Sequence, residues 1–374
     1  KIVGVGFSYP NQSTTNGGKM LKKLPLDFDV ENKKVLKKVS SANKNLAELK
    51  GLLESLPNKF LLLNTLTLRE AKDSSEIENI ITTNDELYKA DIKIIPDSSA
   101  TKEVRNYREA LNVGYKLVTE KELLTTNIIV EIQCVLEENN QGIRRTPGTI
   151  IQNTSTGEIV HTPPQNYEEI LTYMSNLERY INDELDDFDP LVKMAIIHYQ
   201  FESIHPFSDG NGRTGRIINI LYLILNGLLD IPVLYLSSYI IKTKNQYYSL
   251  LKKLNNPKEA EENEAWEEWI LYMLDGIEKT SNESLELIKK ISKLMNEFEA
   301  EIKEKESKIY RKELLEILFQ HPYTKIEFLI DTMGISRQTA SSYLEKLVGI
   351  GLLRKEKIWK ENFYINTKLW EALS

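Results

Sequence analysis

The sequence predicts a mainly α-helical protein with one small β-hairpin in its middle and a winged helix domain at its C-terminal end. Three observations support this fold class. Apolar residues recur at three- and four-residue steps along most of the chain, which is typical of amphipathic helices. Two short β-branched runs flank a turn-rich segment at 153–157, which is a hairpin pattern. The last segment, 309–374, follows the order helix, helix, turn, helix, hairpin.

The composition limits the class of protein. The 374 residues are 41% hydrophobic and 28% charged, within the range of globular proteins, and the length suggests about two or three domains. A net charge of -7 argues against a chain that binds nucleic acid over its whole surface. One cysteine, Cys134, excludes an intramolecular disulfide framework and is expected to be a small buried residue. No apolar run approaches the roughly 18 residues of a membrane span, and no secretory signal is recognisable, so a cytoplasmic protein is expected.

The first hundred residues divide into two segments. Residues 1–19 are rich in polar residues, proline and glycine and are expected to be a loose tail without assigned chemistry. Residues 20–100 are an N-terminal helical region. Its first helix begins after Phe28 and ends before Pro57, and a second helical segment is expected from Phe60 to Leu87.

The segment 101–256 is expected to be the core of the protein. Helical periodicity covers 100–114 and 127–138, and a hairpin follows at 149–161. Asp189-Pro190 starts another helix, with Asp as the N-cap and Pro in the first turn. His198 lies on the apolar stripe of this helix and is expected to be a buried core histidine. A helix from Ile217 to Leu225 comes next.

The run from His205 to Arg216 concentrates reactive side chains. His205 carries an imidazole that can accept a proton near neutral pH, and Asp209 offers hard oxygens to a cation such as Mg²⁺. The backbone N–H groups of 210–212, Gly-Asn-Gly, can form an anion-binding nest at the start of the next helix. Arg213 and Arg216 are three residues apart, so they share a helix face and can both reach a polyphosphate. There is no Gly-Lys-Ser/Thr after the glycines, so this is not a Walker A loop.

This run matches, at every fixed position, the signature His-Pro-Phe-x-Asp/Glu-Gly-Asn-Gly-Arg-x-x-Arg of the Fic family, and the chain resembles that family. The resemblance implies a protein adenylyltransferase that moves AMP from ATP to a Ser, Thr or Tyr hydroxyl of a target protein. It implies that His205 is the catalytic base and that Asp209 holds Mg²⁺. ATP would be bound by the residues Glu78, His161, Asp209, Gly210, Asn211, Gly212, Arg213, Arg216, Tyr248, Leu251 and Asn255.

A shorter motif upstream resembles the inhibitory Ser/Thr-x-x-x-Glu-Gly/Asn sequence of many Fic proteins. Ser74 and Glu78 lie four residues apart and share a helix face, and Asn79 follows them. The spacing alone is also that of an ordinary helix pair. The resemblance implies that Glu78 pairs with Arg216 and fills the space of the ATP γ-phosphate, which makes this an N-terminally self-inhibited protein.

Two further segments resemble substrate-binding parts of Fic proteins. The hairpin within 148–163 resembles the flap on which a target protein docks by strand addition, and His161 lies on it. Tyr248, Leu251 and Asn255 fall on one helix face and resemble the wall of the adenine pocket, with the Asn amide at the base edge. A surface hairpin without a partner and simple core packing are the alternatives.

The C-terminal part begins with an acidic helical connector at 257–308. From Arg311 onward the winged helix segment has ten Lys/Arg and eight Asp/Glu, a weakly basic balance. Residues 336–360 hold the expected recognition helix and wing, which are the candidates for DNA contact. Such modules also mediate dimerisation, so a DNA-binding role and a homodimer both remain open.

Two alternatives to AMP transfer follow from these patterns. The same site can remove AMP or transfer another phosphate-containing group. A protein of a different class, a nucleotide-sensing transcription regulator that binds DNA through its winged helix, is also compatible with the sequence.

Overall fold

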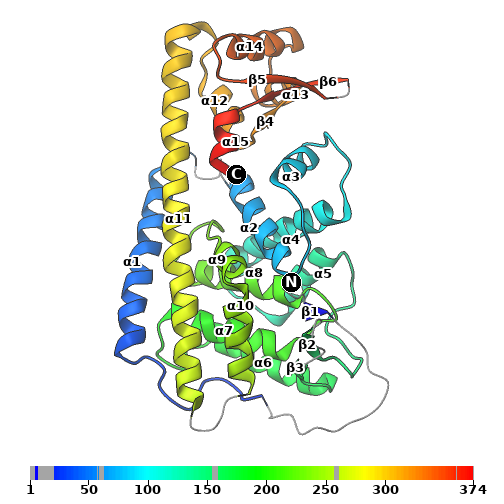
Figure 1. Cartoon of the computed structure of the whole chain (residues 1–374), viewed down its shortest axis with the longest axis vertical. Helices are drawn as coiled ribbons and strands as arrows, with labels where there is room; N and C mark the ends of the chain where they lie inside the picture. The colour runs from blue at the N-terminus through cyan, green and yellow to red at the C-terminus, as the bar shows by residue number, and fades with distance from the viewer. Residues whose placement is uncertain are drawn as a thin grey trace. The chain divides into compact units, whose positions relative to one another are not determined.

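The structure is a computed structural model that describes residues 5–6, 21–56, 58, 63–153, 159–256, 261–358 and 360–373. The described chain is mainly helical, as predicted, with two small antiparallel sheets (Figure 1). Its helices are α1 (Lys33–Ser55), α2 (Leu63–Ile77), α3 (Asn84–Asp91), α4 (Ser99–Lys121), α5 (Thr126–Glu137), α6 (Tyr167–Asn182), α7 (Pro190–Ile204), α8 (Asn211–Leu225), α9 (Leu236–Lys242), α10 (Lys244–Asn255), α11 (Glu262–Lys305), α12 (Lys312–Gln320), α13 (Ile326–Met333), α14 (Arg337–Gly349) and α15 (Thr367–Leu373). Its strands are β1 (Val5–Gly6), β2 (Ile151–Asn153), β3 (Ile159–His161), β4 (Tyr323–Thr324), β5 (Arg354–Ile358) and β6 (Glu361–Ile365).

The chain divides into two compact units. The first comprises Lys1–Gly51, Thr67–Ile81 and Glu103–Asn282, and the second comprises Leu52–Leu66, Thr82–Lys102 and Glu283–Ser374. The domain boundaries inferred from the sequence remain predictions. Within the described residues no helix combines the length and the hydropathy that a membrane crossing needs.

Helices α7 and α8 form the centre of the first unit. Nearly every residue of α7 is buried, so this helix is apolar all round and needs neighbours on every side. Its closest neighbour is α8, and α6 and α5 pack on the outside of this pair. Asp189 caps α7 as expected, because its side chain accepts the N–H of Leu191 at 2.8 Å. The core places the C-terminal end of α7 and the N-terminal end of α8 next to each other.

His198 is a core histidine, as predicted. It is fully buried in α7, stacked on the Trp269 ring with centroids 6.0 Å apart. One ring nitrogen lies 2.8 Å from the Tyr247 hydroxyl and the other 3.1 Å from the Asn219 amide. Burial lowers the pKa of His198 to about 3, so the ring stays neutral inside the core.

The flap hairpin is formed by β2 and β3, in the region expected. A third strand, β1, pairs antiparallel with β2, with Val5 opposite Asn153 and Gly6 opposite Gln152. The sheet order is therefore β1-β2-β3, and the outer edge of β2 is covered by the chain itself (Figure 1). The loop of the hairpin, 154–158, lies outside the described residues.

The second helical segment, expected to run unbroken to Leu87, is interrupted in the structure. Helix α2 stops at Ile77, and a turn at Glu78 leads to Asn79, whose φ of 64° is in the left-handed region. A new helix, α3, starts at Asn84 with a complete capping box between Thr83 and Glu86. Asparagine tolerates the left-handed conformation and ends helices in this way, which the periodicity alone did not reveal. Helices α6 and α15 and the strands β1 and β4 were also not anticipated from the sequence.

The C-terminal part of the second unit has the winged helix order. Helices α12, α13 and α14 are followed by the hairpin β5–β6, and β4 joins β6 to give the sheet order β4-β6-β5. Gly334, with a φ of 65°, forms the turn between α13 and α14, and Ser336 caps α14. Helix α3 packs here as well, since the Tyr88 and His321 rings meet edge to face at 5.2 Å.

Candidate functional site

The loop between α7 and α8 is a tight turn held by its own side chains. His205 is the C-cap of α7 and adopts a left-handed conformation, with φ 48° and ψ 60°. Asn211 fastens the other end, because its amide donates to the Phe207 carbonyl and accepts the Phe207 N–H, both at 2.9 Å. Phe207 itself is fully buried. The side chain of Asn211 therefore holds the turn between α7 and α8 closed.

The N-terminal end of α8 has the features of an anion site. Gly210 is its N-cap with a φ of 75°, and no side chain caps the helix there. The left-handed φ of Gly210 strains any residue with a Cβ, and a Cβ there would also overlap the carboxylate of Glu137, so glycine is favoured at this position. The N–H groups of the first helical turn point out of the helix, and the helix dipole adds a partial positive charge.

The surroundings of His205 keep its imidazole neutral. Its side chain is buried, with 6% of its surface exposed. Burial, together with the nearby charge of Arg144 and the ring of His161, lowers the pKa of His205 to about 3. The imidazole is therefore neutral at pH 7 and can accept a proton.

Arg216 is buried and held by the end of α2. Its Nε donates to Ser74 Oγ at 2.8 Å, and its Nη2 donates to the Ser74 carbonyl and to Glu78 Oε1, both at 2.9 Å. A Cβ at Gly212 would overlap Glu78 Oε1, so this carboxylate lies directly against the glycine loop. The structure thus brings Ser74, Glu78 and Arg216 together at the start of α8, in the arrangement that the upstream motif implied.

Arg213 is also paired with acidic side chains, which the sequence did not predict. Its Nη1 donates to Glu103 on α4 at 3.0 Å, and its Nη2 donates to Glu137 on α5 at 2.7 Å. Burial raises the pKa of Glu137, and Asp209 and Glu103 raise it further, while Arg213 lowers it. Both arginines of the loop therefore already have carboxylate partners.

Asp209 lies exposed at the tip of the loop. One of its oxygens accepts the Gly210 N–H at 2.7 Å, and its carboxylate otherwise faces the solvent beside the anion site. Magnesium binds proteins through one or two carboxylates and completes its coordination with substrate phosphates and water. A single carboxylate next to a phosphate site fits that requirement. Among the described residues no cluster of three or more His, Cys, Asp or Glu side chains forms a metal site by itself.

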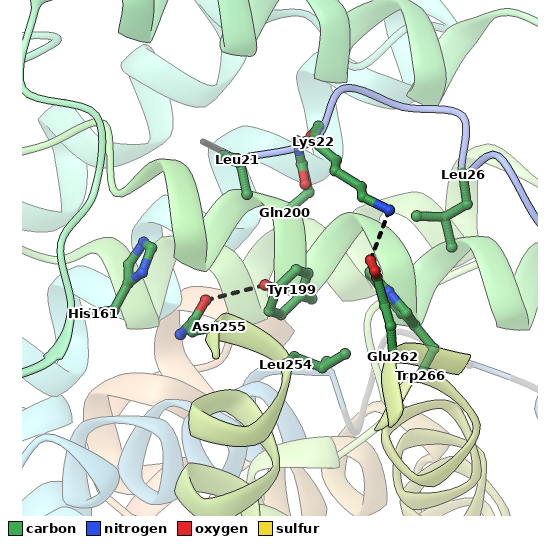
Figure 2. Close-up of a pocket in the computed structure, with 10 residues that line it drawn as sticks. All are labelled: Leu21, Lys22, Leu26, His161, Tyr199, Gln200, Leu254, Asn255, Glu262 and Trp266. Atoms are coloured by element: carbon green, nitrogen blue, oxygen red, sulfur yellow. Dashed lines mark hydrogen bonds and ion pairs between the residues drawn. The ribbon is translucent and has the colours of Figure 1, made fainter. Parts of the chain in front are cut away.

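A pocket lies beside the C-terminal half of α7 (Figure 2). Figure 2 shows Tyr199 in the middle, bonded to Asn255 on one side, with the ion pair of Lys22 and Glu262 on the other. The Tyr199 hydroxyl donates to Asn255 Oδ1 at 3.1 Å, and the Lys22 ammonium lies 2.9 Å from Glu262. The pocket is lined by Leu21, Lys22, Leu26, His161, Tyr199, Gln200, Leu254, Asn255, Glu262 and Trp266.

The pocket includes two of the residues expected to bind the nucleotide, one on the flap and one on the predicted adenine wall. Asn255 and His161 line it, whereas Tyr248 and Leu251 do not. His161 lies 2.8 Å from the Ser203 carbonyl, and the Ser203 hydroxyl donates to Asn255 at 3.3 Å. Ser203 is two residues before His205, so this pocket adjoins the turn that carries His205.

The sequence of the core matches family profiles. Residues 36–116 match "Fic/DOC family N-terminal", 123–223 match "Fic/DOC family", and 294–369 match "Protein adenylyltransferase SoFic-like, C-terminal domain". The chain belongs to the Fic/DOC family. The matched core spans the loop of His205 and both of its arginines.

Two curated relatives show how far the sequence likeness extends. A probable protein adenylyltransferase of Aquifex aeolicus is 30% identical over 199 residues, which are 51% of this chain and 56% of that protein. Protein adenylyltransferase fic-1 of Caenorhabditis elegans is 32% identical over 93 residues, 25% of this chain and 17% of that protein. The chain thus spans about half of the first relative and less than a fifth of the second.

Solved structures of Fic proteins share the fold. A Fic family protein from Desulfovibrio desulfuricans has a TM-score of 0.56 at 17% identity, covering 89% of this chain and 96% of its own. A Fic domain containing signaling protein from Bacteroides thetaiotaomicron has a TM-score of 0.54 at 20% identity, covering 66% and 95%. At sequence identities of 17% and 20%, the similarity to these two structures shows a shared fold and nothing more specific.

Several residues of this Fic site had no signal in the sequence. Glu103, Glu137 and Arg144 are ordinary charged positions on helices and in a loop, and only the fold brings them to Arg213 and His205. Glu70 is an exception, because it lies four residues before Ser74 and therefore on the same face of α2.

Glu70 anchors α2 in the core. Its carboxyl accepts the Ser237 N–H at 3.1 Å, the Ser237 hydroxyl and the Tyr107 hydroxyl at 3.1 Å. Burial raises the pKa of Glu70 from 4.5 to about 8, in spite of the Ser237 bonds that lower it. The helix that carries Ser74 and Glu78 is therefore fixed by an acid that stays protonated at neutral pH.

A pH dependence of stability follows for Glu70. Between about pH 4.5 and pH 8 the folded chain keeps a proton on Glu70 that the unfolded chain loses, so the free energy of unfolding falls as the pH rises through this window. Glu70→Gln removes this term, and we expect its thermal midpoint to fall less than that of the parent between pH 5 and pH 8. Glu76→Gln, a half-exposed position on the same helix, is the matched control and should keep the parent's slope. Parallel slopes for parent and Glu70→Gln would contradict the assignment.

Proposed function

We propose that this protein is an adenylyltransferase that moves AMP from ATP to a hydroxyl group of a target protein, and of itself. The observation that carries the proposal is the neutral, buried His205 at the end of α7, directly before an open helix N-terminus with two arginines. A base and a polyphosphate site in one turn suit the transfer of a phosphate-linked group to a hydroxyl. The names of the relatives agree with this activity.

In the proposed mechanism His205 takes the proton of a Ser, Thr or Tyr hydroxyl. The hydroxyl oxygen forms a bond to the α-phosphorus, the bond from that phosphorus to the bridging oxygen breaks, and pyrophosphate leaves. The N–H groups at the start of α8 bind phosphate oxygens, and Arg213 neutralises charge on the leaving group. Mg²⁺ held by Asp209, when bound, would supply further charge neutralisation on the phosphates.

The target protein is proposed to dock on the flap at 148–163. A peptide can add to a hairpin as an extra strand through main-chain hydrogen bonds. Since β1 covers the outer edge of β2, an incoming strand has to replace Val5–Gly6 to use that edge. The protein's own N-terminal segment thus competes with the target for the flap.

The adenine base is proposed to occupy the pocket of Figure 2 beside Asn255. Asn255 Oδ1 already accepts bonds from Tyr199 and Ser203, which orients its amide so that Nδ2 can donate to a ring nitrogen. Tyr248 and Leu251, on the same helix α10, do not line this pocket, and Leu251 is buried.

The contact of Glu78 with Arg216 is proposed to be inhibitory. Its carboxylate lies against Gly212 and uses the guanidinium that a γ-phosphate would need. Releasing Glu78 would free both the charge and the space.

AMP removal on the same site remains an alternative outcome for the same residues, and the mass of the modified protein separates the two reactions. The regulator hypothesis is less favoured by the winged helix surface. Arg337 at the start of α14 is paired with Glu327 at 2.9 Å, and Lys355 of the wing is paired with Glu345. Binding of DNA in a gel-shift assay, with a steep salt dependence, would restore that hypothesis.

His205→Ala tests the base. We expect transfer from ATP labelled at the α-phosphate to fall about 10²–10⁴-fold, which is the usual contribution of a general base. His321→Asn is the control, because histidine 321 belongs to the second unit and asparagine can accept the same Tyr323 N–H. Equal transfer by His205→Ala and the parent would refute the mechanism.

Glu78→Gly tests the inhibition. Removing the carboxylate leaves Arg216 to the nucleotide, and we expect self-modification to rise about tenfold or more, since each 1.4 kcal/mol of recovered binding is worth tenfold. Glu76→Gly is the matched control on the same helix, because Glu76 pairs with Lys72 and not with Arg216. If both variants behave like the parent, Glu78 is not inhibitory.

Asn255→Ala tests the base pocket. Losing one hydrogen bond to the base should raise the KM for ATP about 2–10-fold and reduce the preference of ATP over GTP, with little effect on kcat. Asn256→Ala, the next residue, is exposed and serves as the control. A lower kcat with an unchanged KM would show that Asn255 acts only through its bonds to Tyr199 and Ser203.

A further inference from the structure

Arg144 is a buried cation whose hydrogen bonds, within the part of the chain that the structure describes, go to backbone carbonyl groups. It lies in the segment between α5 and β2, with 4% of its surface exposed. Among the ion pairs of the described residues none includes Arg144, and burial lowers its pKa to about 10. Burying a charge without an opposite charge costs free energy. The guanidinium is therefore expected to be held by hydrogen-bond acceptors that contribute to the site.

The bonds of Arg144 converge on the turn of His205. Its Nε donates to the His205 carbonyl at 2.8 Å, and its backbone N–H donates to the Pro206 carbonyl at 2.9 Å. One residue therefore holds two successive carbonyl groups at the point where the chain leaves α7. The turn needs such support, because His205 is in the left-handed region, where a residue with a Cβ is strained.

A third bond connects the same guanidinium to the base of the flap. Its Nη2 donates to the Pro164 carbonyl at 2.5 Å, three residues after the end of β3. The planar guanidinium can hold two carbonyl groups in fixed directions at once, which an ammonium group cannot do. Arg144 thus fastens the flap and the turn of His205 to each other.

We propose that Arg144 is a positioning residue for His205, which fixes the left-handed turn and so aims the imidazole at the reacting hydroxyl. The inference rests on the proposed role of His205 as the base. Arg144 does not contact the reacting atoms in this mechanism and acts through the His205 and Pro206 carbonyl groups. Its charge also disfavours a proton on the imidazole, together with burial and the neighbouring His161.

The activity arm compares Arg144→Lys and Arg144→Met in the Glu78→Gly background. Both variants lose the planar fork, so kcat should fall about 100-fold, the effect of a displacement of about 1 Å at a reacting group, with the KM for ATP within about threefold. Arg145→Met is the control, because Arg145 is exposed and stacks on Tyr167 at 4.2 Å. An unchanged kcat in Arg144→Met would overturn the proposal, and Arg144→Lys decides if the Met variant does not fold.

The second measurement follows the NMR signal of His205 directly and does not depend on enzymatic activity. The chain has four histidines, so the imidazole Cε1 proton of His205 can be assigned with His205→Gln and followed by NMR from pH 5 to pH 8. In the parent and in Arg144→Lys this proton should not titrate in that range. In Arg144→Met, which lacks the charge, its titration should move upward in pH, and its chemical shift should change in both variants.

The activity and NMR measurements together distinguish a failure of the Arg144 proposal from a failure of the proposed transferase function. A loss of kcat together with a loss of ATP binding and an unchanged His205 signal would show a merely structural role and overturn the proposal. If neither the parent nor Glu78→Gly transfers AMP, the proposed function fails. In that case a shifted His205 signal still supports the link between Arg144 and His205, and an unshifted one refutes it.

Discussion

The buried guanidinium of Arg216 is the constraint around which the site is built. Burial disfavours its charge, but neighbouring acidic groups, Glu78 first, outweigh burial and raise the pKa of Arg216. A cation in such a place needs several acceptors, because breaking one of its bonds leaves a buried charge uncompensated. Ser74 and Glu78 supply them from the end of α2. The left-handed turn at Asn79 ends this segment directly after Glu78, and the contacts of Glu70 with Ser237 hold the same helix in the core.

Local patterns predicted much of the fold. Helical periodicity and the Asp189-Pro190 cap identified α7, and the turn-rich segment between β-branched runs identified the flap. The break after α2 was missed, because apolar spacing continues through Glu78 while the backbone turns at Asn79. Strand β1 was missed because two residues form a strand only when β2 offers its edge. A pairing between distant segments does not produce a periodic pattern of apolar residues in the sequence of either segment.

The candidate site also contains residues that the sequence predicted and residues that only the tertiary structure brings together. Residues within one contiguous run, from His205 to Arg216, could be assigned from the sequence, because the chemistry and the spacing are visible together. Their partners come from α2, α4, α5 and the loop before the flap, and each is a common charged residue at its own position. Among these partners, Ser74 and Glu78 were accessible from the sequence through the upstream motif. Glu137 and Arg144 are decided by tertiary packing, which brings α5 and the following loop against the turn.

Arg213 and Arg216, both in the first two turns of α8, are already paired with carboxylates, and this affects how a nucleotide would bind. Arg213 is bound by Glu103 and Glu137, and Arg216 by Glu78, so each cation is already neutralised. A triphosphate would therefore exchange partners with carboxylates, and its binding energy is the difference between two sets of charged hydrogen bonds. Glu78 is the more exposed partner of its ion pair with Arg216: 27% of the Glu78 side chain is accessible to solvent, compared with 2% of the Arg216 side chain. Under the proposed inhibition, the carboxylate would therefore move into water while the guanidinium stayed in place, so that the end of α2, and not α8, would be displaced by the nucleotide.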